Sequence, residues 1–494
     1  MTYLDKYKRI YEDWIMSNLD TEYSIQCNEN QPNVADSSRY LSELFSVEPF
    51  ILNNKNQIFG NEETHKYLTS NLKDNDLPYR RLLKTDIKVI VQAGLHPVSE
   101  AEFPIYDTKK NFFDKFLEPN VVKKMRNGTL ILLLYQGWEA ENFEDEMYSR
   151  LKKDKYKNFY QMFKDVLDEY KLPRSSMIIV SSNLYGNEHK DYGVNVIYDN
   201  IMEWNTLHRG IAPSYQDKML EKTGLDFKSI NLDYSVDEYL ESIKNIKTPL
   251  CRLSRTKHIQ RDWMLYFIKK FGWYDRSVVE QKFFNEGSII WENTTRRTAM
   301  ELCEKTKELK YLTKYFELIE DDSVFGEIKK SLPIIASNYE KHPNFESWEI
   351  HSNLPIPMEV YKRSVFSWVS TSLPDQADMI FLNQSTFNPI LYYHPIIWLS
   401  YPNTTKYFKK YGYKSYDWLF ESESKIDDSE MFSHRLVYNL HDINKVMNMS
   451  NDELYNKIKD NKDTLVHNRN LLLECRSIER IITKLYRMIY ETTI

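Results

Sequence analysis

Residues 382–400 read LNQSTFNPILYYHPIIWLS, and this stretch decides the fold class. A polar loop is followed by the start of a helix and then by a buried strand over residues 394–399. In α/β proteins, a helix N-terminus that follows a strand and a loop holds anions such as a nucleotide phosphate, because its first N–H groups have no partner in the helix. The residues of this helix start that we expect to bind an anion are Gln384, Ser385, Thr386 and Asn388.

Four apolar runs upstream of this stretch predict the strands of a first sheet. They lie at residues 87–92, 129–135, 177–182 and 194–198, and they are rich in β-branched residues without a polar face. Strands that are covered on both sides have this composition. A helical pattern over residues 143–170 separates two of the strands, which indicates βαβ units and a parallel sheet.

The same alternation of strands and helices follows in the second half of the chain. We expect a strand at 248–253, a helix at 258–271 that Gly272 ends, a mostly helical segment at 301–319 and a strand at 366–370, followed by a helix at 387–393. The C-terminus closes with helices, one of them over residues 463–489 with an apolar face, and one that starts at the capping box of Ser450 and Glu453.

These patterns predict an α/β protein with two Rossmann-like domains that face a cleft. The first 85 residues show no clean period, and we interpret them as a mainly helical or irregular extension. The predicted division is an N-terminal extension at 1–85, a first Rossmann-like domain at 86–245, a second at 246–450 and long C-terminal helices at 451–494.

Composition excludes several classes of protein. The chain has 494 residues with 41% hydrophobic residues and only 12 Gly, which is typical of a folded globular protein. A net charge of −6 gives no overall electrostatic signature of nucleic-acid binding. Four scattered cysteines without a CxxC motif fit a reducing compartment and no cysteine-rich zinc site. No apolar run is long enough for a transmembrane helix, and the charged N-terminus does not look like a signal peptide, so we expect a cytoplasmic location.

A basic cluster next to the predicted strand 248–253 is the strongest candidate site. Arg252, Arg255, Lys257 and Arg261 fall at the end of this strand and the start of the helix that follows. Positive side chains together with helix N–H groups favour a diphosphate. The alternative is a solvated basic loop, or pairing of these side chains with acidic neighbours.

Glu139 and His96 follow two strands of the first sheet, and each is a candidate general base for an acceptor hydroxyl. The alternatives are a helix cap or ion-pair partner for Glu139 and a packed or capping residue for His96. Asp74 and Asp76 form a D-x-D pattern, but they lie in a polar turn rather than after a buried strand, so we expect no metal site.

Several segments resemble the motifs of one family. RNGTLILLL at 126–134, followed by Glu139, resembles the family's pattern "G-x-hydrophobic strand-x-x-E-G". The segment 181–185 resembles its pattern "strand-x-x-N". PLCRLSR at 249–255 resembles "F-x-C-L-N-R", and the segment 384–396 resembles "E-K-T-F-K-P-I-x-x-x-H-P". Over residues 85–440 the chain resembles glycosyltransferase-like proteins of large marine phages, which are distantly similar to fucosyltransferase and exostosin C-terminal domains.

The resemblance implies a GT-B-type glycosyltransferase in the cytoplasm of a host cell. The second domain would bind a nucleotide sugar without a metal, and the first would bind the acceptor, a surface glycan or a DNA base. The sequence departs from the family at its Glu-Lys pair, which is Gln384-Ser385 here, and at a Glu that falls at about Thr371. These departures leave a second hypothesis open, a non-catalytic binding or structural module with the same fold. The oligomeric state is not indicated.

Overall fold

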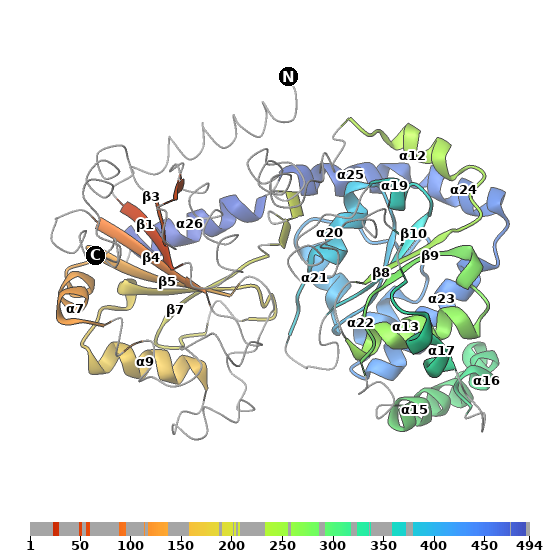
Figure 1. The fold of residues 1–494 in the computed structure, drawn as a ribbon, viewed down its shortest axis with the longest axis horizontal. Coiled ribbons are helices and arrows are strands. Elements are labelled where there is room, and N and C mark those ends of the chain that lie inside the picture. Colours follow the sequence, from red (N-terminus) through yellow and green to blue (C-terminus); the bar gives the residue numbers. More distant parts are fainter. Residues whose placement is uncertain are drawn as a thin grey trace. The chain divides into compact units, whose positions relative to one another are not determined.

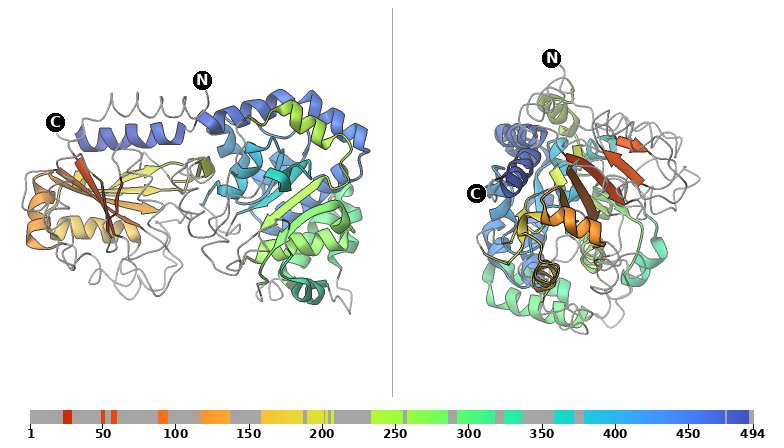
Figure 2. Two further views of the ribbon diagram at one scale, coloured as in Figure 1. Left: turned by 45° about the horizontal axis from the view of Figure 1, so that its top comes forward. Right: turned by 90° about the vertical axis from the view of Figure 1, so that its left-hand side faces the viewer.

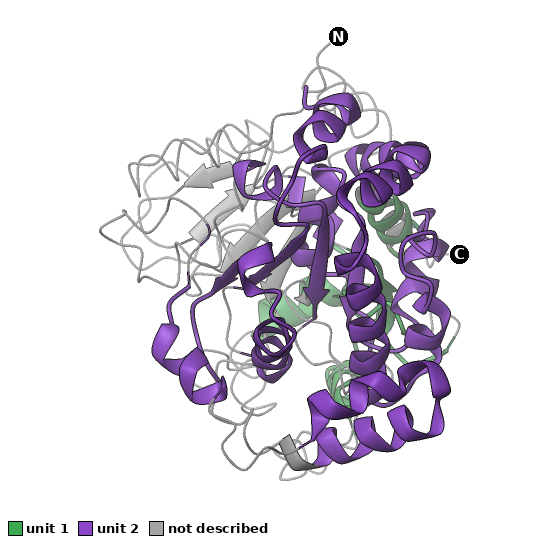
Figure 3. Cartoon of the chain, turned by 90° about the vertical axis from the view of Figure 1, so that its right-hand side faces the viewer, with its two compact units in different colours: residues 1–201, 477–494 green, residues 202–476 purple. Residues whose placement is uncertain are grey.

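The computed structural model divides into two compact units, residues 1–201 with 477–494 and residues 202–476 (Figure 3). It describes residues 23–28, 49–51, 56–59, 88–94, 113, 117–136, 158–186, 190–200, 202–203, 206–207, 233–254, 258–285, 292–317, 324–334, 336, 358–371, 379–474 and 476–490.

The first unit contains a seven-stranded sheet in the order β2-β3-β1-β4-β5-β6-β7 (Figure 1). Its strands are β1 Tyr23–Asn28, β2 Pro49–Ile51, β3 Asn56–Phe59, β4 Lys88–Gly94, β5 Leu130–Gln136, β6 Met177–Ser181 and β7 Asn195–Tyr198. β1 and β4 to β7 are mutually parallel, and β2 and β3 pair antiparallel at one edge. β1, β2 and β3 were not predicted from the sequence, and they place part of the predicted extension within the sheet.

Helices cover both faces of the first sheet. α9 (Phe159–Glu169) lies on one face and α26 (Arg476–Tyr490) on the other, and α7 (Pro119–Arg126) lies near one end of the sheet (Figures 1 and 2). Leu130, Leu132 and Leu134 of β5 join the core formed with α7 and α9. Because side chains alternate along a strand, the intervening residues of β5 face the other side. The continuous apolar run that predicted β5 therefore reflects burial on both faces.

The second unit contains a four-stranded parallel sheet in the order β11-β10-β8-β9. Its strands are β8 Leu250–Ser254, β9 Ser277–Gln281, β10 Phe366–Ser370 and β11 Ile396–Leu399. α13 (Ile259–Lys270) connects β8 to β9, and α20 (Gln384–Leu391) connects β10 to β11. The two connections run in opposite directions along the sheet. Right-handed crossovers therefore place α13 and α20 on opposite faces.

The remaining helices surround the second sheet (Figure 1). Two tryptophans show how α23 is held: Trp368 Nε1 donates to Asn439 Oδ1 at 3.0 Å, and Asn439 Nδ2 donates to the backbone oxygen of Trp398 at 3.0 Å. The helices are α12 Val236–Ile243, α15 Glu292–Lys305, α16 Thr313–Phe316, α17 Val324–Ser331, α19 Met358–Tyr361, α21 Thr404–Lys410, α22 Glu423–Asp428, α23 Phe432–Met447, α24 Asn451–Asp460 and α25 Lys462–Glu474. Short 3₁₀ helices lie at η1 Arg174–Ser176, η2 Tyr274–Arg276 and η3 Lys307–Leu312.

The α/β fold with two parallel, Rossmann-like sheets and C-terminal helices is confirmed. Gly272 has a φ of 68° just after α13, as the predicted helix end requires, and Ser450 caps α24 by accepting from the Glu453 N–H. The helix expected over 143–170 is described only as α9, since residues 143–157 lie outside the described part of the chain. The facing cleft, the GT-B arrangement and the domain boundaries at residues 85, 245 and 450 stay predictions.

Candidate functional site

The carboxyl edge of the second sheet contains a reversal of strand order. β8 lies between β9 and β10, so the chain first adds a strand on one side of β8 and later adds β10 on the other side. Open α/β sheets bind ligands outside the carboxyl ends of the strands at such a point. β8 ends at Ser254 and β10 at Ser370, so the residues around these two strand ends form the candidate site.

The start of α13 is tied to the end of β10. Arg261 lies in the first turn of α13, is 7% exposed, and its Nε donates to Ser370 Oγ at 3.2 Å. The neighbouring Gln260 donates its amide to the backbone oxygen of Thr371. These bonds bring a buried cation from one strand connection to the end of the adjacent strand, although the two segments are 109 residues apart in sequence.

Arg252 is more deeply buried than we expect of a side chain that contacts a bound diphosphate. Its side chain is 1% exposed, and it donates to the backbone oxygens of Glu280 at 3.1 Å and Arg261 at 2.5 Å. Burial, together with the nearby charge of Arg261, lowers the pKa of Arg252 to about 9, so it remains charged at neutral pH. Because its hydrogen bonds go to the backbone, we interpret Arg252 as a support for the start of α13 rather than as a ligand contact.

Four of the predicted site residues lie outside the described part of the chain. Arg255 and Lys257 belong to the connection between β8 and α13, and Glu139 and His96 follow strands of the first sheet. Asp74 of the D-x-D pattern also lies outside it. The roles predicted for these side chains stay predictions.

α20 presents three of its four predicted residues on one side. Gln384, Ser385 and Asn388 are partly exposed, as residues at positions i, i+1 and i+4 of a helix are when they share a face. Thr386 is fully buried, and its hydroxyl accepts a hydrogen bond from Trp398 Nε1 at 3.4 Å. Thr386 therefore has a packing role in this structure, and the exposed start of α20 is formed by the other three residues.

Asn383, which the sequence analysis did not select, is the N-cap residue of α20 and is 9% exposed. Its side chain does not cap the helix, and its Nδ2 approaches the backbone oxygen of Ser370 at 3.4 Å. Its Oδ1 is buried and has no hydrogen-bond partner among the described residues. The preference of Asn for the N-cap position is the sequence signal that identifies such a residue.

Charges of both signs are buried at this edge, because Asp262 and Glu280 act on Arg252 together with Arg261. His258 is the N-cap residue of α13, and burial together with the charge of Arg261 lowers its pKa to about 3. His258 is therefore neutral at physiological pH. The charge of Arg261 favours an anion bound next to it, whereas the buried carboxyl groups of Asp262 and Glu280 oppose one.

Three hydroxyl groups lie next to one another just after the ends of β10 and β11. Thr371 is fully buried and accepts a hydrogen bond from Ser400 Oγ at 3.0 Å, and Ser400 in turn accepts from Thr404 Oγ1 at 3.1 Å. In the resembling family a glutamate is expected at about Thr371. Here that position carries a neutral hydroxyl that is engaged inside the protein.

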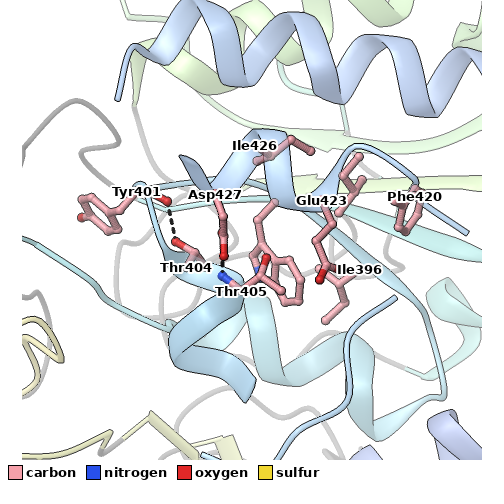
Figure 4. Close-up of a pocket in the computed structure, with 10 residues that line it drawn as sticks. Ile396, Tyr401, Thr404, Thr405, Phe420, Glu423, Ile426 and Asp427 are labelled. Carbon is pink, nitrogen blue, oxygen red and sulfur yellow. Dashed lines mark hydrogen bonds between the residues drawn. The ribbon is translucent and has the colours of Figure 1, made fainter. Parts of the chain in front are cut away.

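A small pocket lies farther along β11 and next to α21 and α22 (Figure 4). Its two acidic side chains are both engaged: Asp427 accepts from the N–H groups of Thr405 at 2.8 Å and Lys406 at 2.7 Å, and Glu423 pairs with Lys409 at 3.1 Å. The cavity volume of about 10 Å³ admits about one water molecule. This pocket is too small for a nucleotide or a sugar.

The described residues contain no group of three side chains placed to hold a metal ion. In the same part of the chain, no helix combines the length and the apolar composition that crossing a membrane requires. Comparisons with models of known protein families and with curated proteins give no match. The resemblance to phage glycosyltransferase-like proteins therefore stays a prediction.

Proposed function

We propose that this protein is a glycosyltransferase that moves a sugar from a nucleotide-sugar donor to an acceptor glycan or DNA base. In this proposal the carboxyl edge of the second sheet holds the diphosphate of the donor. The observation that carries the proposal is the buried Arg261, whose guanidinium reaches Ser370 at the reversal of strand order. A preorganised cation at this place stabilises a departing diphosphate without a metal.

The exposed start of α20 supports the same proposal. Gln384, Ser385 and Asn388 face outward on a helix that follows a strand and a loop. The predicted Arg255 and Lys257 would add positive charge from the connection after β8. Glu139 or His96 would take the proton of the acceptor hydroxyl if the reaction inverts the anomeric carbon.

The binding part of the proposal is tested by calorimetric titration with nucleoside diphosphates and nucleotide sugars at concentrations up to millimolar. We expect the wild-type protein to bind at least one of them. Arg261→Ala should weaken this binding about 10- to 100-fold, because a charged hydrogen bond contributes about 1.5–3 kcal/mol. Arg297→Ala is the matched control, since Arg297 is 74% exposed in the same unit. Absence of binding by the wild-type protein to the whole panel would refute the proposal.

A non-catalytic binding module is the second candidate, and one observation favours it. Thr371 is buried and engaged with Ser400 where the resembling family has a glutamate. Release of free nucleotide from the bound nucleotide sugar separates the two functions. Turnover, by transfer or by slow hydrolysis, supports the enzyme, whereas tight binding without any turnover supports the binding module.

A further inference from the structure

The buried amide oxygen of Asn383 indicates a second chemical group of the ligand, in addition to its phosphate. Asn383 is 9% exposed, and its Oδ1 has no hydrogen-bond donor among the described residues. Burying an acceptor without a partner is costly, and such groups are rare in folded proteins. Other described side chains also bury such an atom, and Asn383 is singled out because its amide contacts Ser370, to which Arg261 donates.

The orientation of this amide follows from its neighbour. A backbone oxygen can only accept a hydrogen bond, so the Asn383 amide turns its Nδ2 toward the oxygen of Ser370. Its Oδ1 is then left as an acceptor. The hydroxyl of the same Ser370 accepts from Arg261. A cation and an uncharged acceptor thus flank one residue, Ser370, from the starts of two different helices.

These two groups require different parts of a ligand. Arg261 attracts phosphate oxygens, but those oxygens carry no hydrogen that they could donate to Asn383. The donor must come from a neutral group attached close to the phosphate. In a nucleotide sugar, the nearest such groups are the hydroxyls of the two sugars that flank the diphosphate.

We propose that Asn383 is a specificity-determining residue that accepts a hydrogen bond from a sugar hydroxyl next to the bound phosphate. This inference rests on the proposed function and adds to it the recognition of a hydroxyl by a neutral amide. A ligand without the hydroxyl leaves the buried oxygen unsatisfied and binds more weakly. Discrimination of this kind is strong when the protein group has no other partner.

The test measures binding of the diphosphates of uridine, guanosine, adenosine and cytidine, each as the ribose, 2′-deoxy and 3′-deoxy form, together with the matching nucleotide sugars. The proteins compared are the wild type and the variants Asn383→Ala and Asn383→Asp. Wild type should prefer the ligand that carries the recognised hydroxyl by about five- to tenfold. Asn383→Ala should lose this preference while it still binds the ligand that lacks the hydroxyl.

The Asp variant separates recognition from packing. Asn383→Asp keeps an acceptor oxygen but places a negative charge near the phosphate, so it should weaken all ligands and still discriminate the hydroxyl. If Asn383→Ala no longer prefers the ribose ligands over the deoxyribose ligands, the recognised hydroxyl belongs to the ribose. If Asn383→Ala instead no longer binds the nucleotide sugar more tightly than the diphosphate, the recognised hydroxyl belongs to the transferred sugar.

Asn158→Ala is the matched control, because Asn158 is the N-cap residue of α9 in the other unit and its side chain caps that helix. This variant should leave every affinity unchanged. If the wild-type protein binds no nucleotide, both the proposed function and this inference are refuted. If nucleotides bind and Asn383→Ala changes all affinities by one common factor, or changes none, only the inference is refuted.

Discussion

The carboxyl edges of the two sheets use buried polar side chains in different ways. In the first unit, Asp199 follows β7 and is fully buried. Its carboxylate receives Nε of Arg480 at 3.1 Å and Nη2 at 2.9 Å, and Nζ of Lys484 lies 3.4 Å away. The N–H of Asn200 donates to the same carboxylate at 2.7 Å. This network fastens α26 to the sheet.

At the corresponding edge of the second unit, one partner of the buried cation is a hydroxyl group. Arg261 donates to the hydroxyl of Ser370, and the buried Oδ1 of Asn383 has no donor among the described residues. The two edges therefore use their buried polar groups for different roles. A network in which each charge meets an opposite charge stabilises the fold, whereas a buried acceptor without a donor lowers stability unless a ligand supplies one.

The largest expected effect is the loss of the network in the first unit. Asp199→Ala leaves Arg480 and Lys484 without their carboxylate, and breaking a buried ion pair from one side costs about 3 kcal/mol of unfolding free energy. Urea unfolding at neutral pH measures this loss. Glu474→Ala is the control, because its ion pair with Arg476 is exposed and contributes less than about 1 kcal/mol. Equal losses in the two variants would show that the Asp199 network does not fasten α26.

A second buried carboxyl group with a lysine neighbour belongs to the second unit. Glu423 accepts from the Tyr416 N–H at 3.1 Å and pairs with Lys409 at 3.1 Å. Burial nevertheless raises its pKa from 4.5 to about 7. One backbone N–H and one lysine therefore do not offset the cost of burying this carboxyl group.

The raised pKa of Glu423 predicts how stability depends on pH. Between pH 4.5 and 7 the folded protein keeps the proton of Glu423, whereas the unfolded chain has lost it. The folded state then binds more protons, so its stability falls as the pH rises through this window. Glu423→Gln should reduce the fall by about 2 kcal/mol, measured as unfolding free energies at pH 5 and pH 8.

Glu421→Gln is the control for this measurement. Glu421 is 61% exposed, and its hydrogen bond with Lys445 lowers its pKa, which is the opposite direction. Burial also raises the pKa of Asp442, to about 6. Part of the decrease in stability with rising pH therefore remains in both variants. A fall of the same size in wild type and Glu423→Gln would contradict the prediction.

The sequence predicted the strands that are mostly apolar and missed β9, as it missed β1, β2 and β3. β5 and β6 stood out because both of their faces are buried. β9 reads SVVEQ, in which only Val278 and Val279 are apolar, and it lies at the edge of its sheet. Short mixed strands of this kind lack a periodic signal, and only their pairing with a neighbour defines them.

The residues of the candidate site were selected from local sequence, and those that depend on strand pairing were not. Arg261 was selected because it follows a strand and lies at the start of a helix, and its role stays a prediction. Ser370 gained its role only when β10 was placed beside β8. The burial of Arg252 was not predicted, because a strand buried on both faces gives no indication of which side chains turn inward, and its role as a diphosphate contact stays a prediction.

The smallest expected effect compares the two N-cap asparagines, Asn158 and Asn383. Asn158 accepts from the Gln161 N–H at 2.9 Å, so Asn158→Ala should cost about 1 kcal/mol of unfolding free energy. Asn383→Ala removes a buried acceptor without a donor and only a weak 3.4 Å contact to Ser370, so we expect a change within about 0.5 kcal/mol of zero. Urea unfolding of the ligand-free protein measures both. A loss at Asn383 as large as that at Asn158 would mean that the amide of Asn383 stabilises the ligand-free fold and is not reserved for a ligand.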